Sequence, residues 1–314
     1  MLKKLCQKYH NFFNIWNVDW LAFYWITDHA INLKSDIEFL YMCTYNMFSA
    51  ELKTLDNYLN NILIKKWIHK FQNSADALIF FIFWKNEELH FCVDYCELNI
   101  IIIKNCYFLS LTSKLLNQLN SSIVFSKIDL QNIYHKIYIH QNNKWKTAFH
   151  MWYRHFEYQI VSFNLTNISI IFQVYINCAL CDLIDNFCIV YLDNILVFLK
   201  SKKKHYQHLQ LIIKCLWHAE LYANLKKCKF FKLKVKYLDF LINENDLHMN
   251  LSHVQMISDW CNHSSKIFHN IQIFIEFCNF YWWFIFNFAD IAWFLHSLLY
   301  DMKKNRKSDL ITDK

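Results

Sequence analysis

Two aspartates at the ends of apolar runs have the setting that metal-dependent chemistry requires. Asp129 ends a run that begins at Phe125, and Asp193 lies beside Asn194 between two runs of β-branched and aromatic residues within 187–200. The second pattern predicts a strand, a two-residue turn at Asp193-Asn194 and a second strand. A carboxylate held rigidly at such a tip can organise a hard cation such as Mg²⁺. Two strand-end aspartates on separate segments indicate two-metal phosphoryl transfer, whereas a solvated Asp-Asn turn is the structural alternative.

The elements that must position these residues have an unusual composition. The chain has 314 residues and 55% hydrophobic content, which allows one large or two modest domains with a sizeable core. It contains no glycine and no proline, although ordinary usage would supply roughly 20 and 15 of them. The apolar pattern therefore predicts a globular fold, but one whose turns lack their usual residues.

Positive charge gathers after the second aspartate. The chain carries 33 Lys and Arg against 26 Asp and Glu, a formal net charge of +7. The lysines of this region are Lys200, Lys202, Lys203, Lys204, Lys226, Lys227, Lys229, Lys232, Lys234 and Lys236. Such runs are typical of a solvated charged face, and in a polymerase they would follow the phosphates of template and primer.

The cysteines do not predict a metal site. Of the 12 cysteines, Cys178 and Cys181 form a CxxC pattern, but no second CxxC or paired histidines complete a zinc site. The basic start at 1–4 is followed by polar and aromatic residues rather than an apolar run, so no secretion signal is expected.

Seven sequence blocks carry a resemblance to a known family. They are FCVDYCELN (91–99), FSKIDLQNIYHKI (125–137), WKTAFHMWYRHFEY (145–158), FNLTNISIIFQ (163–173), YLDNILVF (191–198), LYANLKKCKF (221–230) and FNFADIA (286–292). In order and spacing they resemble the reverse transcriptase of gypsy-type long-terminal-repeat retrotransposons, over about residues 9–299. The resemblance implies an α+β right-hand polymerase fold with fingers, a palm built on an antiparallel sheet and a thumb-like C-terminal part.

The resemblance also implies a division of the chain. Residues 1–50 would be a connector, 51–245 the fingers and palm, and 246–314 a thumb-like or connection region without a ribonuclease H domain. The expected elements are a short strand at 27–33, a helix from Glu51, a hairpin of 77–84 with 89–95, helices at 111–119, 172–180 and 208–221, and strands at 236–242 followed by a hairpin around 245–246.

The resemblance assigns roles to particular residues. Asp129 and Asp193 would hold two Mg²⁺ ions, with Mn²⁺ possible, and Asn194 stands where the family has a second aspartate. The residues implied in binding the nucleotide are Lys85, His90, Tyr134, Phe163 and Asn164, and those implied in binding nucleic acid are Lys226, Lys227 and Lys229. His90 replaces an arginine that binds the triphosphate, and Asn164 replaces a glycine. A core tyrosine on an amphipathic segment explains Tyr134 as well as a sugar-pocket role does.

The departures from the family pattern share one property. Where the family has arginine, this chain has Cys96, Cys106, Trp282, Trp283 and His90. Where the family has glycine, it has Asn164, Asp239 and Asp246, and where the family has proline, it has Ser162, Phe108 and Ser110. Each change can arise from C-to-T or G-to-A transitions alone. These departures indicate a transposon copy that was hypermutated by a genome-defence process of the repeat-induced kind.

The apolar run at 280–300 is about as long as a membrane span. The resemblance instead predicts thumb-like helices with an exposed aromatic patch prone to aggregation, and no membrane partner.

The function implied is an RNA-directed DNA polymerase domain that acts on an RNA or DNA template-primer and dNTPs, and that is catalytically inactive in this copy. The alternatives are a non-catalytic nucleic-acid-binding remnant and an unexpressed pseudogene product. The rest of a retrotransposon polyprotein would be its partner, and a cytoplasmic or nuclear location is expected if the protein is made.

Overall fold

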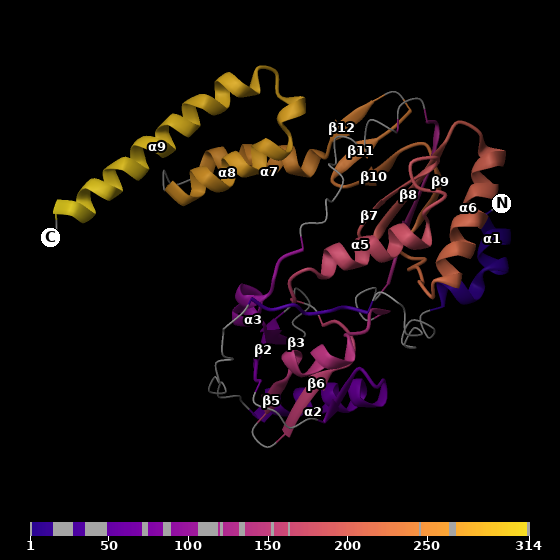
Figure 1. Ribbon diagram of the computed structural model, residues 1–314. Coiled ribbons are helices and arrows are strands. Elements are labelled where there is room, and N and C mark those ends of the chain that lie inside the picture. The colour runs from indigo at the N-terminus through magenta and orange to yellow at the C-terminus, as the bar shows by residue number, and fades with distance from the viewer. Residues whose placement is uncertain are drawn as a thin grey trace. The chain divides into compact units, whose positions relative to one another are not determined.

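The computed structural model divides the chain into two compact units, 1–235 and 236–314 (Figure 1). It describes residues 2–14, 28–34, 49–70, 75–83, 89–105, 119, 122–131, 136–151, 154–162, 164–244, 246–263 and 268–312. The expected boundary before residue 246 falls inside the second unit, and the assignment of the parts as connector, fingers and palm, and thumb stays a prediction.

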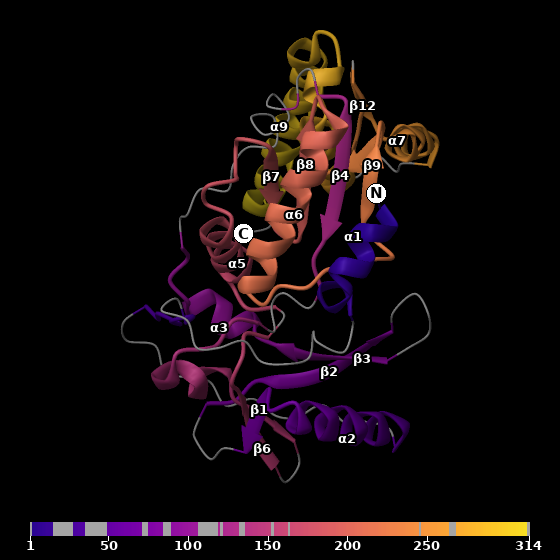
Figure 2. The ribbon, with the colours of Figure 1, turned by 90° about the vertical axis from the view of Figure 1, so that its right-hand side faces the viewer.

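A four-stranded antiparallel sheet forms the upper part of the first unit. Its strand order is β7-β8-β4-β9, with bounds β4 Val124–Asp129, β7 Cys188–Tyr191, β8 Asn194–Leu199 and β9 Lys229–Lys232. Helices α5 (Ile168–Ala179) and α6 (Lys202–His218) pack against it, and α1 (Leu2–Lys8) lies beside α6 in both views (Figures 1 and 2). The short 3₁₀ helix η1 (His10–Phe13) follows α1.

The sequence explains why β4 and β8 lie in the centre of this sheet. Residues 195–198 of β8 are all buried, on both faces of the strand, whereas β9 begins and ends with exposed lysines. A continuous apolar run suits a strand covered on both sides, and charged ends suit an edge strand. One cluster of buried side chains, from Leu5 to Phe230, joins this sheet to the rest of the first unit.

A buried polar contact fixes α6 to the sheet. The Ser126 hydroxyl on β4 lies 2.7 Å from Nε2 of His205 on α6 and accepts a hydrogen bond from the Phe231 amide at 3.0 Å. Burial lowers the pKa of His205 to about 4, so the imidazole is neutral at physiological pH. The contact therefore fixes the orientation of α6 on the sheet without placing a charge in the core.

The lower part of the first unit contains two smaller sheets. β1 (Ile68–Lys70), β6 (Arg154–Tyr158) and β5 (Phe149–Met151) form one in that order, and β2 (Leu78–Phe83) pairs with β3 (Leu89–Asp94) in the other. Helices α2 (Ser49–Ile64) and α3 (Cys96–Ile101) and the 3₁₀ helix η4 (Gln141–Thr147) complete this part. Strand β2 also contacts β5, which brings the two sheets together.

The second unit contains a small sheet and several helices. Its sheet β10-β11-β12 is formed by Val235–Tyr237, Phe240–Ile242 and Leu247–Met249. The helices are α7 (Leu251–His263), α8 (Phe268–Phe280), η5 (Trp282–Phe284) and α9 (Phe288–Thr312). Among the residues described, none of the helices has the length and hydropathy that a membrane crossing requires.

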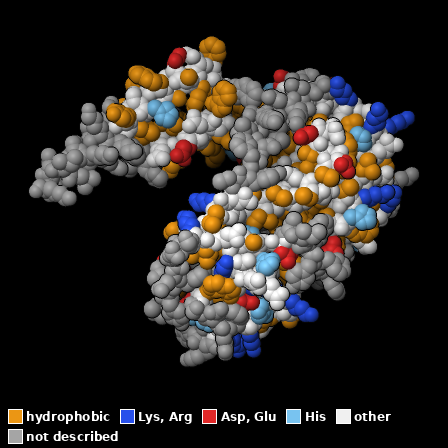
Figure 3. All heavy atoms as spheres, viewed as in Figure 1, with side chains coloured by type: hydrophobic (Ala, Val, Ile, Leu, Met, Phe, Trp, Pro, Cys, Tyr) orange, Lys and Arg blue, Asp and Glu red, His pale blue; other side chains and the backbone are white. Residues whose placement is uncertain are grey.

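Exposed aromatic side chains lie on α8, η5 and α9 and on the short segment between η5 and α9, and Figure 3 shows hydrophobic side chains gathered over this region. Trp282 is 54% exposed, Phe286 95% and Trp293 70%. The expected exposed aromatic patch is confirmed for these residues, and its effect on aggregation stays a prediction.

Most elements expected from the sequence are confirmed. The α+β class, the helix from Glu51, the hairpin β2–β3, the helix over 172–180 and the strands around 236–249 are all present. The helix at 111–119 lies outside the described residues except for Leu119.

The helix expected at 208–221 is confirmed as α6, with other bounds. It begins at Lys202 and ends at His218, because its polar first turn hides the start of the apolar period. One expected element was wrong. Instead of a strand at 27–33, His29 and Leu33 form isolated bridges with Ile139 and Ile102.

Ten of the residues that the structure describes adopt a positive φ, and only glycine does so without steric cost. Asn164 (φ 79°) and Asp239 (φ 65°) are among them, and the resemblance predicts a lost glycine at both. The third position with such a prediction, Asp246, is not among the ten. Two of the three positions at which a lost glycine is predicted therefore have left-handed backbone.

A further strained position ends helix α2. The Trp67 amide donates to the Ile62 carbonyl and the Lys66 amide to the Leu63 carbonyl, both at 3.0 Å, while Lys66 has φ 58°. This hydrogen-bond pattern is a Schellman motif with Lys66 at the position that glycine favours.

Replacing Lys66 by glycine should therefore stabilise the protein. Lys66 is exposed, so Lys66→Gly removes the left-handed strain without loss of packing and should raise the free energy of unfolding by about 1 kcal/mol. Urea denaturation measures this change. The control is Lys53→Gly on the exposed face of α2, which should lower the free energy of unfolding by about 0.5–1 kcal/mol. Equal effects of the two variants would contradict the assignment of strain.

Candidate active site

Strand pairing brings the two aspartates to one edge of the sheet. Asp129, the last residue of β4, lies opposite Asn194, the first residue of β8. The Leu130 amide donates to the Asp193 carbonyl at 3.0 Å, which fixes the end of β4 to the turn between β7 and β8. Asp129, Asp193 and Asn194 are thus held together by main-chain hydrogen bonds.

The turn differs by one residue from the expected one. Tyr191 pairs with Asn194, so the two turn residues are Leu192 and Asp193, and Asn194 belongs to the strand. Leu192 has φ 51°, a conformation that costs about 1–2 kcal/mol for a residue with a Cβ. The prediction that Asp193-Asn194 forms the tip was wrong. It rested on turn propensity, which favours a polar pair, whereas a tertiary contact decides which residues form this turn.

That tertiary contact comes from Gln173, which the sequence analysis did not identify as a site residue. Gln173 is buried on α5; its side chain accepts a hydrogen bond from the Leu192 amide at 2.8 Å and donates to the Val190 carbonyl at 3.3 Å. Both ends of the side-chain amide are used, so the strained turn is held from the helix beneath it. A glutamine on the buried face of an otherwise apolar helix was the signal available in the sequence.

The side chain of Asn194 is directed at the neighbouring carboxylate. Its Nδ2 donates to Oδ1 of Asp193 at 2.7 Å. An aspartate at this position would bring a second negative charge instead of a hydrogen-bond donor. The amide therefore occupies one acceptor site of the Asp193 carboxylate.

Asp129 lies in a mixed electrostatic environment. Burial raises the pKa of its carboxyl, and the charge of Asp193 raises it further, whereas Lys227 and Lys127 lower it. The Lys227 ammonium lies 3.8 Å from Oδ1 of Asp129. The placement of Asp193 in the turn next to Asn194, which pairs with Asp129, explains why its charge reaches the Asp129 carboxyl.

The segment 222–228 lies along the end of β4. The Gln131 amide donates to the Tyr222 carbonyl and the Asn224 amide to the Asp129 carbonyl, both at 2.9 Å. The Asp129 amide lies 3.4 Å from the Cys228 sulfur, and burial raises the pKa of that thiol to about 12, so it remains protonated. Of the three lysines expected to bind nucleic acid, Lys226 and Lys227 lie in this segment and Lys229 follows it at the start of β9, and all three are exposed.

The residues expected to bind the nucleotide are only partly described. Lys85, Tyr134 and Phe163 lie outside the described residues. The main chain of His90 pairs with Ile82 in the β2–β3 hairpin, and Asn164 is exposed on the segment that leads to α5.

Asn164 is tied to two neighbouring elements. Its carbonyl accepts a hydrogen bond from Asn99 of α3 at 2.7 Å, and its side chain donates to the Val93 carbonyl of β3 at 3.5 Å. These contacts describe how Asn164 is held, and its role towards a nucleotide stays a prediction.

Comparison with known proteins decides the family. A model of the family described as "Reverse transcriptase (RNA-dependent DNA polymerase)" matches residues 51–242. The chain belongs to the reverse transcriptase family. Among curated relatives, the Transposon Tf2-7 polyprotein of Schizosaccharomyces pombe is 27% identical over 216 residues, which cover 69% of this chain and 16% of the relative. The chain thus matches about a sixth of that polyprotein's length.

Solved structures of reverse transcriptases share the fold. A foamy viral protease-reverse transcriptase bound to an RNA/DNA hybrid is similar with a TM-score of 0.78 and 19% identity over 96% of this chain and 40% of that one. A second foamy viral structure, bound to double-stranded DNA, gives 0.82 and 19% over 95% and 52%. The right-hand polymerase fold is therefore confirmed for this reverse transcriptase chain.

Reverse transcriptases use divalent metal ions, and the donor set of this site fits such an ion in part. Asp129 and Asp193 offer carboxylate oxygens at one sheet edge, which suits a hard cation. The amide of Asn194 donates to Asp193, so the third carboxylate of the family's pattern is replaced by a neutral group.

The ion pair at this site predicts a measurable shift in titration. Removing the Lys227 charge in Lys227→Met should raise the pKa of Asp129, because Lys227 lowers it. Since the pKa of Asp129 in the folded state lies above its ordinary value, the stability that the protonated carboxyl contributes is complete below that ordinary value and is lost as the pH rises through the folded-state pKa. The variant should move the upper end of that window to higher pH.

Carboxyl carbon NMR titration of Asp129 measures this shift. Lys226→Met is the matched control, because Lys226 is the adjacent exposed lysine and is not among the charges that act on Asp129. An equal shift in both variants would exclude a specific pair between Lys227 and Asp129.

Proposed function

We propose that the chain is the RNA-directed DNA polymerase domain of a gypsy-type long-terminal-repeat retrotransposon, in a hypermutated copy that has lost activity. The observation that carries the proposal is the placement of Asp129 opposite Asn194, with Asp193 in the adjoining turn, in a chain of the reverse transcriptase family. The similarity to a transposon polyprotein supports the retrotransposon origin. An excess of C-to-T and G-to-A changes in the coding DNA, relative to a sibling copy, tests the hypermutation.

The proposed catalytic residues are Asp129 and Asp193, with Asn194 at the position of the lost carboxylate. Magnesium ions, or manganese in their place, would be held by the two aspartates and would supply activation of the primer 3′-hydroxyl and stabilisation of the leaving pyrophosphate. Asp129 must be ionised to act as a ligand, and Lys227 favours its ionised form. Asp193 is fixed by the turn that Gln173 holds, and this fixation supports its role in positioning the primer end.

Asn194 is the reason for the proposed loss of activity. The exchange of a carboxylate for an amide removes one negative charge and one anionic ligand from a site designed for two dications. The amide also donates to Asp193 Oδ1, so it competes with cations for the remaining carboxylate. The changes at His90 and Asn164 would act on the nucleotide, and the defects should therefore compound.

Primer extension tests the loss of activity. The unmodified chain and Asn194→Asp should both give no detectable extension on an RNA template with Mg²⁺ or Mn²⁺. Extension should return only when Asn194→Asp is combined with His90→Arg, Asn164→Gly and glycine at the strained turn positions such as Lys66. Measurable extension by the unmodified chain would overturn the assigned inactivity while leaving the family unchanged.

A non-catalytic nucleic-acid-binding function is the second candidate, because the lysines beside the site are exposed whatever the state of the metal site. Replacing Lys226, Lys227 and Lys229 by glutamine should weaken binding to an RNA–DNA hybrid and reduce the slope of log K against log salt by about 2 to 3, near 0.9 for each lost phosphate contact.

The control for this second candidate carries the same loss of charge elsewhere. Glutamine at Lys3, Lys8 and Lys214, which are exposed on α1 and α6, should leave the salt slope unchanged. An equal loss in both triple variants would show that net charge alone attracts the nucleic acid.

A further inference from the structure

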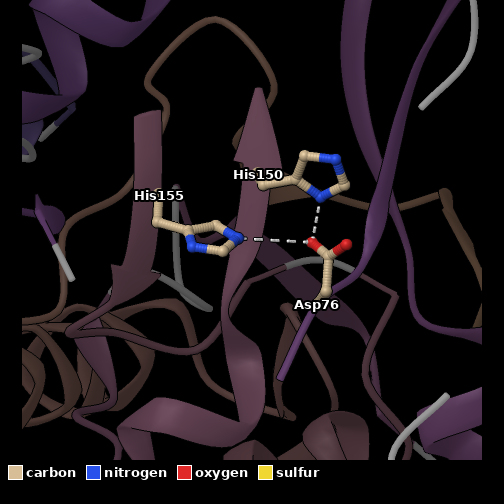
Figure 4. Close-up of side chains that lie close together, drawn as sticks. All are labelled: Asp76, His150 and His155. Carbon is tan, nitrogen blue, oxygen red and sulfur yellow. Dashed lines mark ion pairs between the residues drawn. The ribbon is translucent and has the colours of Figure 1, made fainter. Parts of the chain in front are cut away.

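Two histidines and an aspartate meet in the lower part of the first unit, in a cluster that the polymerase reaction does not use. His150 on β5 and His155 on β6 are direct cross-strand partners, so their side chains project from the same face of the sheet. Asp76 lies just before β2, which contacts β5. Figure 4 shows the two imidazoles directed at the Asp76 carboxylate from different strands.

The donor atoms of the cluster are close enough to share one ion. One ligand atom from each of Asp76, His150 and His155 can be chosen so that all three lie within 4.8 Å of one another. His150 Nδ1 is in contact with Oδ1 of Asp76, and His155 Nε2 lies 3.8 Å from the same oxygen. The two rings are nearly perpendicular, at 86°, so their nitrogens approach the carboxylate from separate directions.

The cluster is buried, which makes the negative charge of Asp76 unfavourable unless it is compensated. The side chains of Asp76, His150 and His155 are 0%, 12% and 24% exposed. Neither oxygen of Asp76 accepts a hydrogen bond from the residues that the structure describes. A buried carboxylate without hydrogen bonds requires a compensating positive charge.

In the neighbouring pair of a histidine with a carboxylate, a lysine supplies positive charge. His69 Nε2 lies 2.6 Å from Glu157 Oε1, and the charge of Lys144 acts on both residues. Within the described part of the chain, Asp76 has ion pairs with the two histidines and with no lysine or arginine. An imidazole compensates its charge only when protonated, whereas a divalent cation would do so with neutral imidazoles.

We propose that Asp76, His150 and His155 bind one zinc ion, with water as the fourth ligand. Two imidazole nitrogens and one carboxylate oxygen are ligands that Zn²⁺ accepts in tetrahedral geometry, whereas Mg²⁺ and Ca²⁺ prefer all-oxygen sites. Zinc–ligand distances of about 2.0–2.1 Å place tetrahedral donors about 3.4 Å apart, so the longest donor separation shortens when the ion binds. The ion would join the segment before β2 to the β5–β6 hairpin, which is a structural role.

The experiment measures zinc binding to the full chain after removal of bound metal with a chelator. Because Cys178 and Cys181 are exposed free thiols, the background protein carries Cys178→Ser and Cys181→Ser. It should bind one zinc ion in titration, with a rise in melting temperature because the metal binds the native state. Zinc X-ray absorption should show only nitrogen and oxygen ligands at about 2.0–2.1 Å, since sulfur would lie near 2.3 Å.

The variants locate the ion. Asp76→Asn and His150→Gln each remove a direct ligand and should weaken zinc binding at least about 100-fold, the upper range seen when even an indirect partner of a metal ligand is lost. His218→Gln, an exposed histidine on α6, is the control and should bind zinc as the background protein does.

Three outcomes would overturn the site: no zinc bound at stoichiometric concentration, a sulfur ligand in the absorption spectrum, or equal affinity in Asp76→Asn and the control. If a variant does not fold, the absorption spectrum and the melting shift of the background protein decide between the ion and a simple histidine–aspartate pair. The polymerase residues are not involved, so this result is independent of the proposed function.

Discussion

The antiparallel register between β4 and β8 is the constraint on which the candidate active site depends. Because side chains alternate along a strand, a shift of one residue would turn Asp129 away from Asn194 and would turn Ser126 away from His205. Residues 195–198 of β8 are buried on both faces, so the loss of the buried polar contact of Ser126 is what makes such a shift costly. The position of the site residues therefore follows from core packing, and the hydrogen bond from Leu130 to the Asp193 carbonyl transmits that register to the turn.

The backbone meets a second constraint, because every left-handed position must be filled by a residue with a side chain. Asparagine and aspartate at Asn164, Asn167, Asp185 and Asp239 tolerate such a conformation better than other residues do. Leu192 and Lys66 do not have this advantage. At Leu192 the conformation is held by Gln173 from α5, and at Lys66 by the hydrogen bonds that close α2. Tertiary contacts thus maintain turns that the local sequence disfavours.

Prediction from the sequence succeeded where the period of apolar residues carries the information. The hairpin β2–β3 and helices α2 and α5 could be predicted in this way, and the family motifs placed both aspartates. The register of the Leu192–Asp193 turn could not, because it depends on a side chain of α5. The sequence also did not predict the ion pair of Lys227 with Asp129 or the cluster of Asp76 with two histidines. Both join segments that are far apart in the chain, and no spacing of residues in the sequence indicates them.

The difference between the apolar core and the proposed active site explains how the proposed loss of activity can leave the fold intact. The core is sustained by many side chains, and exchange of one apolar residue for another of similar size costs little while the pattern remains. The proposed active site depends on single groups, and the neutral amide of Asn194 does not supply the negative charge of an aspartate. The amide there even satisfies Asp193 locally through its 2.7 Å hydrogen bond. A change that removes the ligand for a cation can therefore leave the strand ends well packed, and selection for folding alone would not reverse it.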